Sequence, residues 1–375
     1  MTPEPVRVKV EASSGYPLDP PRWSFAMRLM FSFVAGLAVI VAASSLASAG
    51  PQDGRLDIYF IDVEGGAATL FVTPEGESLL IDSGYPGYDF RDRDRIVDVA
   101  KNYARVEQID HALVSHWHLD HYGNHAALTE KIKVGTFWDR GIPDSLQEDA
   151  KFEERIVAYR AASQNQSKTV KPGDSLPFKS GRTPLSMKVV TASRDVIKNT
   201  GSPNPYAKLH EAMPEDESDN AASVSLLTTF GGFKFLCCGD LTWNIEAKLV
   251  TPNNPLGQVD VFMVTHHGLP SSNNPALVMA IDPVVAIMCN GPTKGGHEQT
   301  QQTLRKVKSL KDLYQLHQNV NLAADQQTPG EFIANVGQLG DCKGVFVKLS
   351  VAADANSYTV QIGADGKARK YQTRK

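Results

Sequence analysis

The sequence predicts an α/β protein in which strands and helices alternate along most of the chain. Its 375 residues suffice for one large domain or two modest ones, and 42% hydrophobic with 21% charged residues is typical of a globular protein. Short apolar runs bounded by Gly, Pro, Asn and Asp recur between segments with helical periodicity. Disordered and fibrous classes are therefore disfavoured, and no internal repeat of fixed period is visible.

The order of elements follows from these runs and from the turn residues between them. Tight turns at Gly65-Gly66 and Pro74-Glu75-Gly76 separate the first three expected strands. In the first half we expect strands over residues 58–63, 67–72, 78–81, 109–115, 135–139 and 185–191, and helices over 91–103 and 148–163. Residues 194–222 have no clean period, and so long an irregular segment inside a domain is usually functional or mobile.

Regular structure is expected again after this segment. Residues 223–230 and 233–238 flank Gly231-Gly232 and predict a hairpin. We expect helices over 241–250, 275–281 and 300–308, strands over 259–265 and 284–289, and a terminal β-hairpin from 344–351 and 358–362.

The N-terminal region has the layout of a secretory signal peptide at residues 27–49. Arg28 precedes an apolar stretch over 29–43, and the small residues Ala47-Ser48-Ala49 predict cleavage before Gly50. The alternative is an N-terminal membrane anchor, although the apolar stretch is shorter than the roughly 20 residues that span a bilayer. Residues 1–26 contain five prolines and are expected to be a disordered extension, or to precede a true start at Met27. Cleavage there would leave a periplasmic or secreted domain over residues 50–375.

Cysteine content and charge add two further expectations. Four cysteines, at 237, 238, 289 and 342, are too few and too irregularly spaced for a disulfide framework. Export permits one bridge, for which Cys289 and Cys342 are the first pair to test, whereas Cys237 and Cys238 should point to opposite faces of a strand. The net charge of −4 provides no general attraction for nucleic acid, so a nucleic-acid partner is not supported by charge. No stable membrane partner is expected, and oligomeric state is left open.

The strongest chemical signal is the segment His116-Trp117-His118-Leu119-Asp120-His121. It directly follows the apolar run Ala112-Leu113-Val114-Ser115, so a strand that ends there would project a loop with three imidazoles and a carboxylate. This ligand set suits zinc and related transition metals. A surface loop that is His-rich by chance is the alternative, but four ligand residues among six favour a metal site.

The pattern HxHxDH after a strand resembles the signature of the metallo-β-lactamase superfamily. Further motifs agree in order, over roughly residues 56–310: Leu79-Leu80-Ile81-Asp82-Ser83-Gly84, Cys238-Gly239-Asp240 and Thr265-His266-His267-Gly268. The resemblance implies a four-layer αββα sandwich with a metal site at one edge. The segments DVEGGAATLF, FGGFKFLCCGDL and VTHHG are similar to the hydrolase domain of the ComEC DNA-uptake proteins. That domain is normally attached to a polytopic membrane protein, so DNA uptake itself is not implied.

Carried over to this sequence, the resemblance implies a centre for two divalent ions, zinc or alternatively manganese. His116 and His118 would bind one ion, Asp120 and His121 the other, and Asp240 would bridge them. Two ions that share a hydroxide lower the pKa of its parent water to about 7 and hold the attacked group, which makes that hydroxide the implied nucleophile. Loss of Asp120 or Asp240 would then abolish catalysis. For Asp240 the structural alternative is a helix N-cap.

Several positions around this centre have two interpretations. Asp82 would orient a ligand, or it simply forms a turn at a strand end. His266 follows the expected strand most closely and is the favoured last ligand, with His267 supporting it or contacting substrate. Many relatives carry a further histidine before the Gly-Asp motif, where this chain has Asn220; Asn220, Asp219 and water, or His210, would complete the His116 and His118 site. That site should therefore hold its ion more weakly.

Other candidate residues carry weaker signals. His297, in Gly295-Gly296-His297-Glu298, lies near the place of a GH element in ComEC-like chains and is a pocket candidate. Aromatic and basic residues near the metal loop, including Trp117, Tyr122, Trp138 and Arg140, are more often packing groups than substrate contacts. Phosphodiester hydrolysis is the leading function. Carboxylic ester, lactone or β-lactam hydrolysis is the alternative, and a non-catalytic metal-stabilised binding module comes third.

Overall fold

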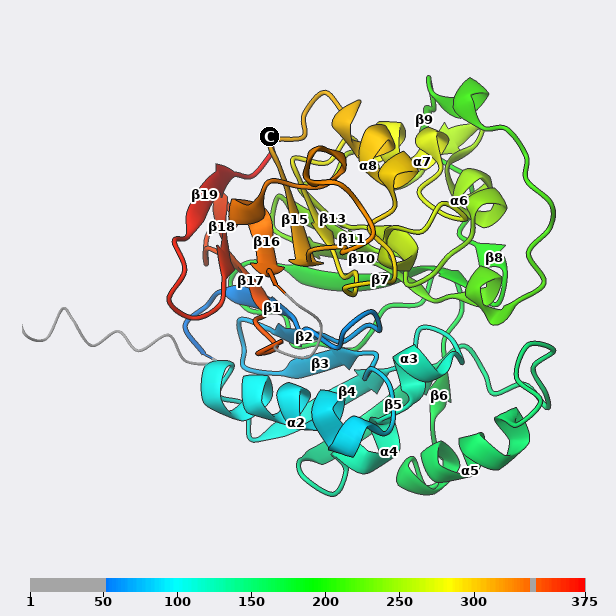
Figure 1. Cartoon of the computed structure of the whole chain (residues 1–375), viewed down its shortest axis with the longest axis vertical. Helices are drawn as coiled ribbons and strands as arrows, with labels where there is room; N and C mark the ends of the chain where they lie inside the picture. Colours follow the sequence, from blue (N-terminus) through cyan, green and yellow to red (C-terminus); the bar gives the residue numbers. More distant parts are fainter. Residues whose placement is uncertain (1–51, 338–341, 375) are drawn as a thin grey trace, which may run out of the picture. The chain divides into compact units, whose positions relative to one another are not determined.

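The structure is a computed structural model that describes residues 52–337 and 342–374 of the chain (Figure 1). The expected extension at residues 1–26 and the signal peptide or anchor at 27–49 lie outside the described residues. The described residues belong to one compact unit. Within the described part of the chain, no helix has both the length and the apolar character needed to cross a bilayer.

Two large mixed sheets form the centre of this unit. The first has nine strands in the order β19-β18-β17-β1-β2-β3-β4-β5-β6. Its strands are β1 (Leu56–Phe60), β2 (Thr69–Val72), β3 (Ser78–Ile81), β4 (Gln108–Leu113), β5 (Lys133–Asp139), β6 (Lys168–Thr169), β17 (Val347–Val351), β18 (Ser357–Ile362) and β19 (Arg369–Gln372). The expected terminal hairpin is present as β17 and β18, and β19 extends it by one antiparallel strand.

The second sheet has eight strands in the order β16-β15-β14-β13-β11-β10-β7-β8. Its strands are β7 (Leu185–Ala192), β8 (Asp195–Val196), β10 (Ser225–Phe230), β11 (Phe233–Cys237), β13 (Val261–Met263), β14 (Val285–Met288), β15 (Asp312–His317) and β16 (Ile333–Asn335). The short strands β9 (Ser202–Pro203) and β12 (Asn253–Asn254) pair separately. The expected hairpin around Gly231-Gly232 is β10 and β11, whereas β15 and β16 were not expected from the sequence.

Helices cover the outer face of each sheet (Figure 1). The first sheet carries α2 (Arg91–Asp98), which continues as the π-helical turn η2 (Val99–Tyr103), then α3 (Leu119–Tyr122), α4 (His125–Leu128) and α5 (Phe152–Ala162). The second sheet carries α6 (Trp243–Val250), α7 (Pro275–Ile281) and α8 (Glu298–Arg305). The remaining single-turn helices are η1 (Tyr88–Phe90), η3 (Ala207–Leu209), η4 (Asp219–Ala222), η5 (Thr265–Gly268), η6 (Ala324–Gln326) and η7 (Gly330–Phe332).

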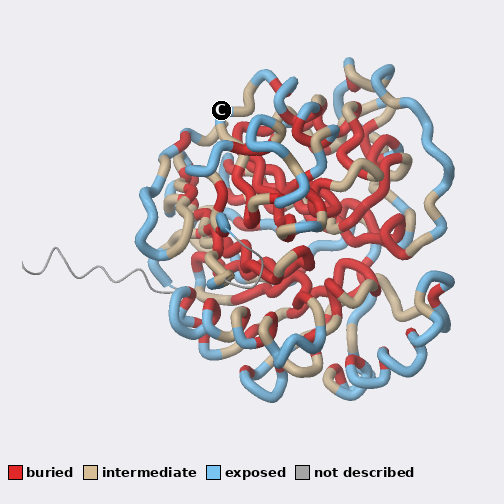
Figure 2. Tube along the Cα trace, in the orientation of Figure 1, coloured by how far each residue is buried: buried red, intermediate tan, exposed pale blue. Residues whose placement is uncertain are grey.

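Three apolar clusters lie between the layers, and Figure 2 shows that the buried residues gather in the interior. One lies between the two sheets, and one lies under the helices on each side. Alternation along β1 shows how the sequence builds this arrangement: Ile58 and Phe60 enter the inter-sheet cluster, while Tyr59 and Ile61 face the helices. Because successive side chains point to opposite faces, one strand serves two cores. The fold is the predicted four-layer αββα sandwich.

The cysteines follow the same alternation. Cys237 belongs to the inter-sheet cluster and Cys238 to the cluster beneath α6 and α7, so the expectation of opposite faces is confirmed. The expected Cys289–Cys342 bridge is not formed, since all four cysteines are free thiols. The two thiols have different surroundings: Cys289 is buried between the sheets, whereas Cys342 Sγ lies 3.0 Å from a carboxylate oxygen of Asp62.

Candidate metal centre

The candidate site lies where strands of both sheets end. In the first sheet β3 and β4 are parallel neighbours, followed by Asp82 and by the loop that begins at His116. In the second sheet β11 and β13 are parallel neighbours, followed by Asp240 and by the turn Thr265–Gly268. Parallel strands end at the same edge of a sheet, and ligands in open α/β sheets bind at that edge. The topology thus brings the predicted motifs together from distant parts of the sequence.

Four side chains form the centre of the site: Asp120, His121, Asp240 and His267. They are all buried, and one ligand atom from each lies within 4.8 Å of the others. His121 Nε2 is 3.4 Å from Asp120 Oδ2 and 3.2 Å from Asp240 Oδ2. His267 Nε2 is 3.4 Å from Asp120 Oδ2 and 3.3 Å from both Asp240 Oδ2 and His121 Nε2. Two carboxylates and two imidazoles thus converge on one small volume.

The two rings are oriented by hydrogen bonds on their far nitrogens. Asp82 Oδ2 lies 2.8 Å from His121 Nδ1, and the carbonyl of Cys289 lies 2.9 Å from His267 Nδ1. Because both partners are acceptors, Nδ1 carries a proton in each ring, and Nε2 of each ring faces the centre. Asp82 has a left-handed φ of 61° and also accepts from the Ser115 amide and hydroxyl.

A second set of side chains lies around the same Asp240 oxygen. His266 Nε2 is 3.4 Å from Asp240 Oδ2, and His116 Nε2 is 3.9 Å from it. The Asn220 side-chain amide is 3.4 Å from His266 Nε2. Asp240 Oδ2 is therefore surrounded by four imidazole nitrogens, from His116, His121, His266 and His267. Asp240 does not cap α6, whose N-cap residue is Thr242.

His118 lies at the solvent side of this second set. Its ring centroid is 4.7 Å from that of His116, and its Nε2 is 3.1 Å from Glu148 Oε1. Glu148 Oε1 also accepts from the Asp219 amide at 2.6 Å. Since Glu148 holds Nε2, Nδ1 is the ring nitrogen of His118 that is available to a metal ion.

The choice between His266 and His267 differs from the sequence-based expectation. His267, not His266, joins Asp120, His121 and Asp240 in the four-residue group. The expectation assumed that the residue nearest the strand end projects into the site. In the structure both histidines have left-handed φ angles of 53°, so the turn redirects the chain before either side chain projects. His266 lies instead between Asp240 and Asn220, at the place where many relatives are expected to have a further histidine.

Burial and charge shift the pKa values of these groups strongly. Burial opposes charge on Asp240, but His121, His267 and His266 outweigh it and hold the pKa of Asp240 well below its usual range. Burial likewise opposes charge on His121, and the carboxylates of Asp240, Asp120 and Asp82 raise its pKa well above the ordinary value. Burial lowers the pKa of His266 to about 4, so this ring is a neutral, metal-competent imidazole at neutral pH.

The residues fit the divalent ions that the motifs imply. The Nε2 atoms of His121 and His267 face each other and two carboxylates, an arrangement that requires positive charge, either from protons on these rings or from metal ions that replace those protons. His116 Nε2 and Asn220 Oδ1 are buried without a hydrogen-bond partner, which is costly unless a cation takes that place. Lys294 also contributes positive charge, because its ammonium group forms an ion pair with Asp120 Oδ2. Buried imidazole and carboxylate donors of this kind bind transition-metal ions such as zinc.

Gly66 lies so close to the backbone of Asp120 that no larger residue fits at this position. A Cβ on Gly66 would lie 2.6 Å from the carbonyl oxygen of Asp120, a distance that real side chains do not tolerate. The next amide, Ala67 N, donates to that carbonyl at 3.0 Å. The Gly65-Gly66 turn after β1 therefore holds the backbone of Asp120 in place.

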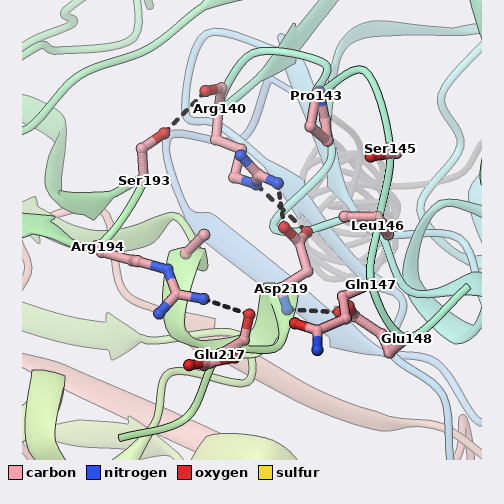
Figure 3. A pocket seen from close by; sticks show the side chains of 11 residues that line it. Arg140, Pro143, Ser145, Leu146, Gln147, Glu148, Ser193, Arg194, Glu217 and Asp219 are labelled. Atoms are coloured by element: carbon pink, nitrogen blue, oxygen red, sulfur yellow. Dashed lines mark hydrogen bonds and ion pairs between the residues drawn. The ribbon is translucent and has the colours of Figure 1, made fainter.

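A polar pocket of about 240 Å³ adjoins the His118 side of the site (Figure 3). Glu148, which bonds to His118, lines it together with Asp219, Arg140 and Arg194. Arg140 pairs with Asp219, and Asp219 accepts from the Trp117 amide at 2.6 Å. Arg194 donates to the carbonyls of residues 216–218. Both guanidinium groups thus stabilise loops through these contacts and are not free to bind an anionic ligand.

The other sequence candidates lie elsewhere. His297 is exposed and caps α8, with its Nδ1 3.3 Å from the Gln299 amide, so it does not line the centre. His210 accepts from the Asn274 side chain at 2.8 Å. Trp117 is buried with Tyr159 and Phe152, as expected of a packing residue. Sequence reasoning missed Glu148 and Lys294, which no motif marks; the only available signal was their polarity in segments next to the motifs.

Comparison with known proteins agrees with this geometry. The family model described as the metallo-beta-lactamase superfamily matches residues 61–316, which is most of the chain. A UPF0173 metal-dependent hydrolase from Herpetosiphon aurantiacus is 38% identical over 70 residues, or 19% of this chain and 26% of that protein. The chain thus matches about a quarter of that relative's length.

Solved structures are similar at low identity. MEM-A1, a subclass B3 metallo-beta-lactamase from a soil metagenome library, is 16% identical, with a TM-score of 0.35 and coverage of 68% of this chain and 85% of that chain. The short form of human tRNase Z is 13% identical, with a TM-score of 0.34 and coverage of 69% and 91%. Because the family model covers the predicted motifs and strands of both sheets, the chain belongs to the metallo-β-lactamase superfamily.

Proposed function

We propose that this metallo-β-lactamase-fold hydrolase cleaves phosphodiester bonds with two divalent ions held about Asp240, and that it acts outside the cytoplasm. The observation that carries the proposal is Asp240 Oδ2, which four imidazole nitrogens approach at 3.2–3.9 Å. A carboxylate shared in this way is what a pair of ions needs as a bridge. When bound, such ions would lower the pKa of a shared water and draw charge from the attacked group.

The chain's own residues divide into two groups about this carboxylate. Asp120, His121 and His267 would hold one ion, and His116, His118 and His266 would hold the other. Asp82 fixes the ring of His121, and Glu148 fixes the ring of His118, so that each presents one defined nitrogen. Five imidazoles and two carboxylates favour zinc, and manganese is the alternative.

A positive side chain next to the centre favours an anionic substrate. Lys294 Nζ pairs with Asp120, and the Lys294 side chain is one-third exposed, at 32%. Once ions engage the Asp120 carboxylate, the ammonium group is available to a phosphoryl oxygen at the rim of the site. A neutral ester or lactone would not use that charge. The resemblance of the metal motifs to ComEC-like hydrolases favours the same substrate class.

A substrate panel tests the reaction. The metal-loaded mature protein should hydrolyse bis(p-nitrophenyl) phosphate and dinucleotides faster than p-nitrophenyl acetate, a lactone or a β-lactam. Asp240→Ala should abolish turnover and lose metal together, because it removes the shared ligand. Full activity of a metal-depleted Asp240→Ala protein would end the two-metal proposal. Preferential turnover of the lactone or β-lactam would reassign the substrate while leaving the metal centre intact.

Export has a separate test. If residues 27–49 act as a signal peptide, N-terminal sequencing of protein from the periplasmic fraction should begin at Gly50. Protein that retains this segment and sediments with membranes would instead show the anchor.

A further inference from the structure

A second group of metal-binding side chains lies apart from the centre described above. It consists of Asp62, His317 and Cys342, whose ligand atoms all lie within 4.8 Å of one another. Asp62 follows β1 in the first sheet, His317 ends β15 in the second sheet, and Cys342 precedes β17. None of the three belongs to the ligand set around Asp240. We propose that these residues form a separate structural site for a thiophilic divalent ion such as zinc.

His317 and Cys342 lie against the two different oxygens of Asp62, and one ligand atom from each residue lies within 4.8 Å of the others. His317 Nε2 is 2.6 Å from Asp62 Oδ1, Cys342 Sγ is 3.0 Å from Asp62 Oδ2, and Cys342 Sγ is 3.8 Å from His317 Nε2. A triangle of sulfur, nitrogen and oxygen donors is one face of a tetrahedral zinc site. The group is not a catalytic triad of the Ser-His-Asp type, in which nucleophile and carboxylate contact different ring nitrogens of the histidine. Here both Asp62 and Cys342 contact Nε2 of His317.

A fourth oxygen donor lies beside the sulfur. Asn335 Oδ1 is 3.5 Å from Cys342 Sγ, and its amide nitrogen is fixed by the carbonyls of Leu316 and Val345 at 2.9 Å each. The side-chain oxygen of Asn335 accepts from the Val345 amide at 2.9 Å, and its second lone pair remains for the group. Sulfur, imidazole, carboxylate and amide donors together favour zinc, cobalt or cadmium over magnesium or calcium.

Burial and charge support a structural role. Asp62 is fully buried and His317 is 4% exposed, so neither is an incidental surface group. Arg95 holds the frame from outside, with Nη1 3.0 Å from Asp62 Oδ2 and Nη2 3.0 Å from the Cys342 carbonyl, while Glu64 balances its charge. On binding, the Cys342 thiol would release its proton to solvent, and the thiolate and Asp62 carboxylate would then neutralise the two positive charges of the ion.

The site would connect the two sheets near the catalytic loop. Asp62 begins the turn that includes Gly66 and Ala67, and Ala67 N donates to the carbonyl of Asp120. An ion held by Asp62 and His317 would thus fix the end of β1 to the end of β15. Its contribution would be to stability and loop position, since none of its ligands approaches Asp240.

Cobalt substitution tests the site with a signal that the main centre cannot give. The main centre offers only nitrogen and oxygen donors, so a near-ultraviolet sulfur-to-cobalt charge-transfer band would report Cys342 alone. Wild-type apoprotein loaded with Co²⁺ should show this band, and Asp240→Ala should keep it while losing hydrolysis. Cys342→Ser should lose the band and one metal equivalent, whereas the matched control Cys289→Ala should retain both. No band in wild type, or a band that persists in Cys342→Ser, would overturn the proposal.

A second experiment uses the wild-type protein, so its result does not depend on whether a variant folds. The metal-free wild-type protein is treated with iodoacetamide, with and without Zn²⁺, and the labelled cysteine is identified by peptide mass spectrometry. Zn²⁺ should suppress labelling at Cys342 at least tenfold. Equal labelling with and without Zn²⁺ would show that the thiol is not a ligand.

Discussion

The buried Glu246 on α6 gives a prediction for stability that depends on pH. Its side chain is 0% exposed, and its Oε2 accepts from the Asn274 amide at 2.7 Å, which connects α6 to the start of α7. Burial raises the pKa of Glu246 from 4.5 to about 8, despite hydrogen bonds that oppose the rise.

The sign of the effect follows from proton binding in the two states. Below about pH 4.5 Glu246 is protonated in both the folded and the unfolded chain, so it adds no pH dependence. Between about pH 4.5 and 8 the unfolded chain loses this proton and the folded chain keeps it, so the free energy of unfolding falls as pH rises. The difference of about 3.5 pKa units, at about 1.4 kcal/mol each, amounts to about 5 kcal/mol, and the full cost is present above about pH 8.

Glu246→Gln should remove this cost, because the amide keeps an acceptor for Asn274 and carries no charge. The assay is urea unfolding of wild type and variant at about pH 5, 7 and 9, in chelator so that metal release adds no pH dependence. The stability of the variant relative to wild type should rise across this range by up to about 5 kcal/mol. The exposed Glu153 on α5 provides the control Glu153→Gln. A difference that stays constant with pH would refute the reasoning.

The remaining predictions concern the metal centre and are measured on purified, metal-loaded protein. His267→Ala should remove the ion on the Asp120 side and His266→Ala the ion on the other side, each read as one lost equivalent in a chelator titration; loss of the same ion from both would contradict the division about Asp240. Glu148→Ala should weaken the ion held by His118 by roughly 10–100-fold in chelator competition, because it frees the ring to rotate; unchanged affinity would show that Glu148 serves only the Asp219 loop. Lys294→Met should raise KM for a phosphodiester about tenfold, the loss expected for one charge-assisted hydrogen bond, and leave KM for a neutral ester unchanged; equal changes for both substrates would remove Lys294 from substrate selection.

Much of the fold and of the site could be predicted because the informative residues are local. The run Ala112-Leu113-Val114-Ser115 specifies a buried strand end, and the motif that follows it supplies its own ligands. Alternation of side chains placed Cys237 and Cys238 on opposite faces. These features depend on residues that are neighbours in the sequence, so they can be predicted without a structure.

Other features could not be predicted because they depend on contacts between distant segments. The roles of His266 and His267 follow from two left-handed residues in a turn, which a strand-end argument does not anticipate. Lys294 and Asp120 are 174 residues apart, and nothing in the segment around Lys294 indicates that its side chain reaches Asp120. Export suggested Cys342 only as one member of the first disulfide pair to test, whereas the carboxylate and the imidazole around its thiol come from distant segments of both sheets.

The pairing of β1 with β17 has a consequence for how the protein is made. Leu56 lies opposite Val351, so β1 can pair with β2 early but lacks its second neighbour until residues 347–351 have been synthesised. Until then one edge of β1 exposes unpaired backbone groups, which are open to association with other chains. Contacts of such long separation also slow folding. The first sheet therefore cannot close around β1 before β17 has been synthesised.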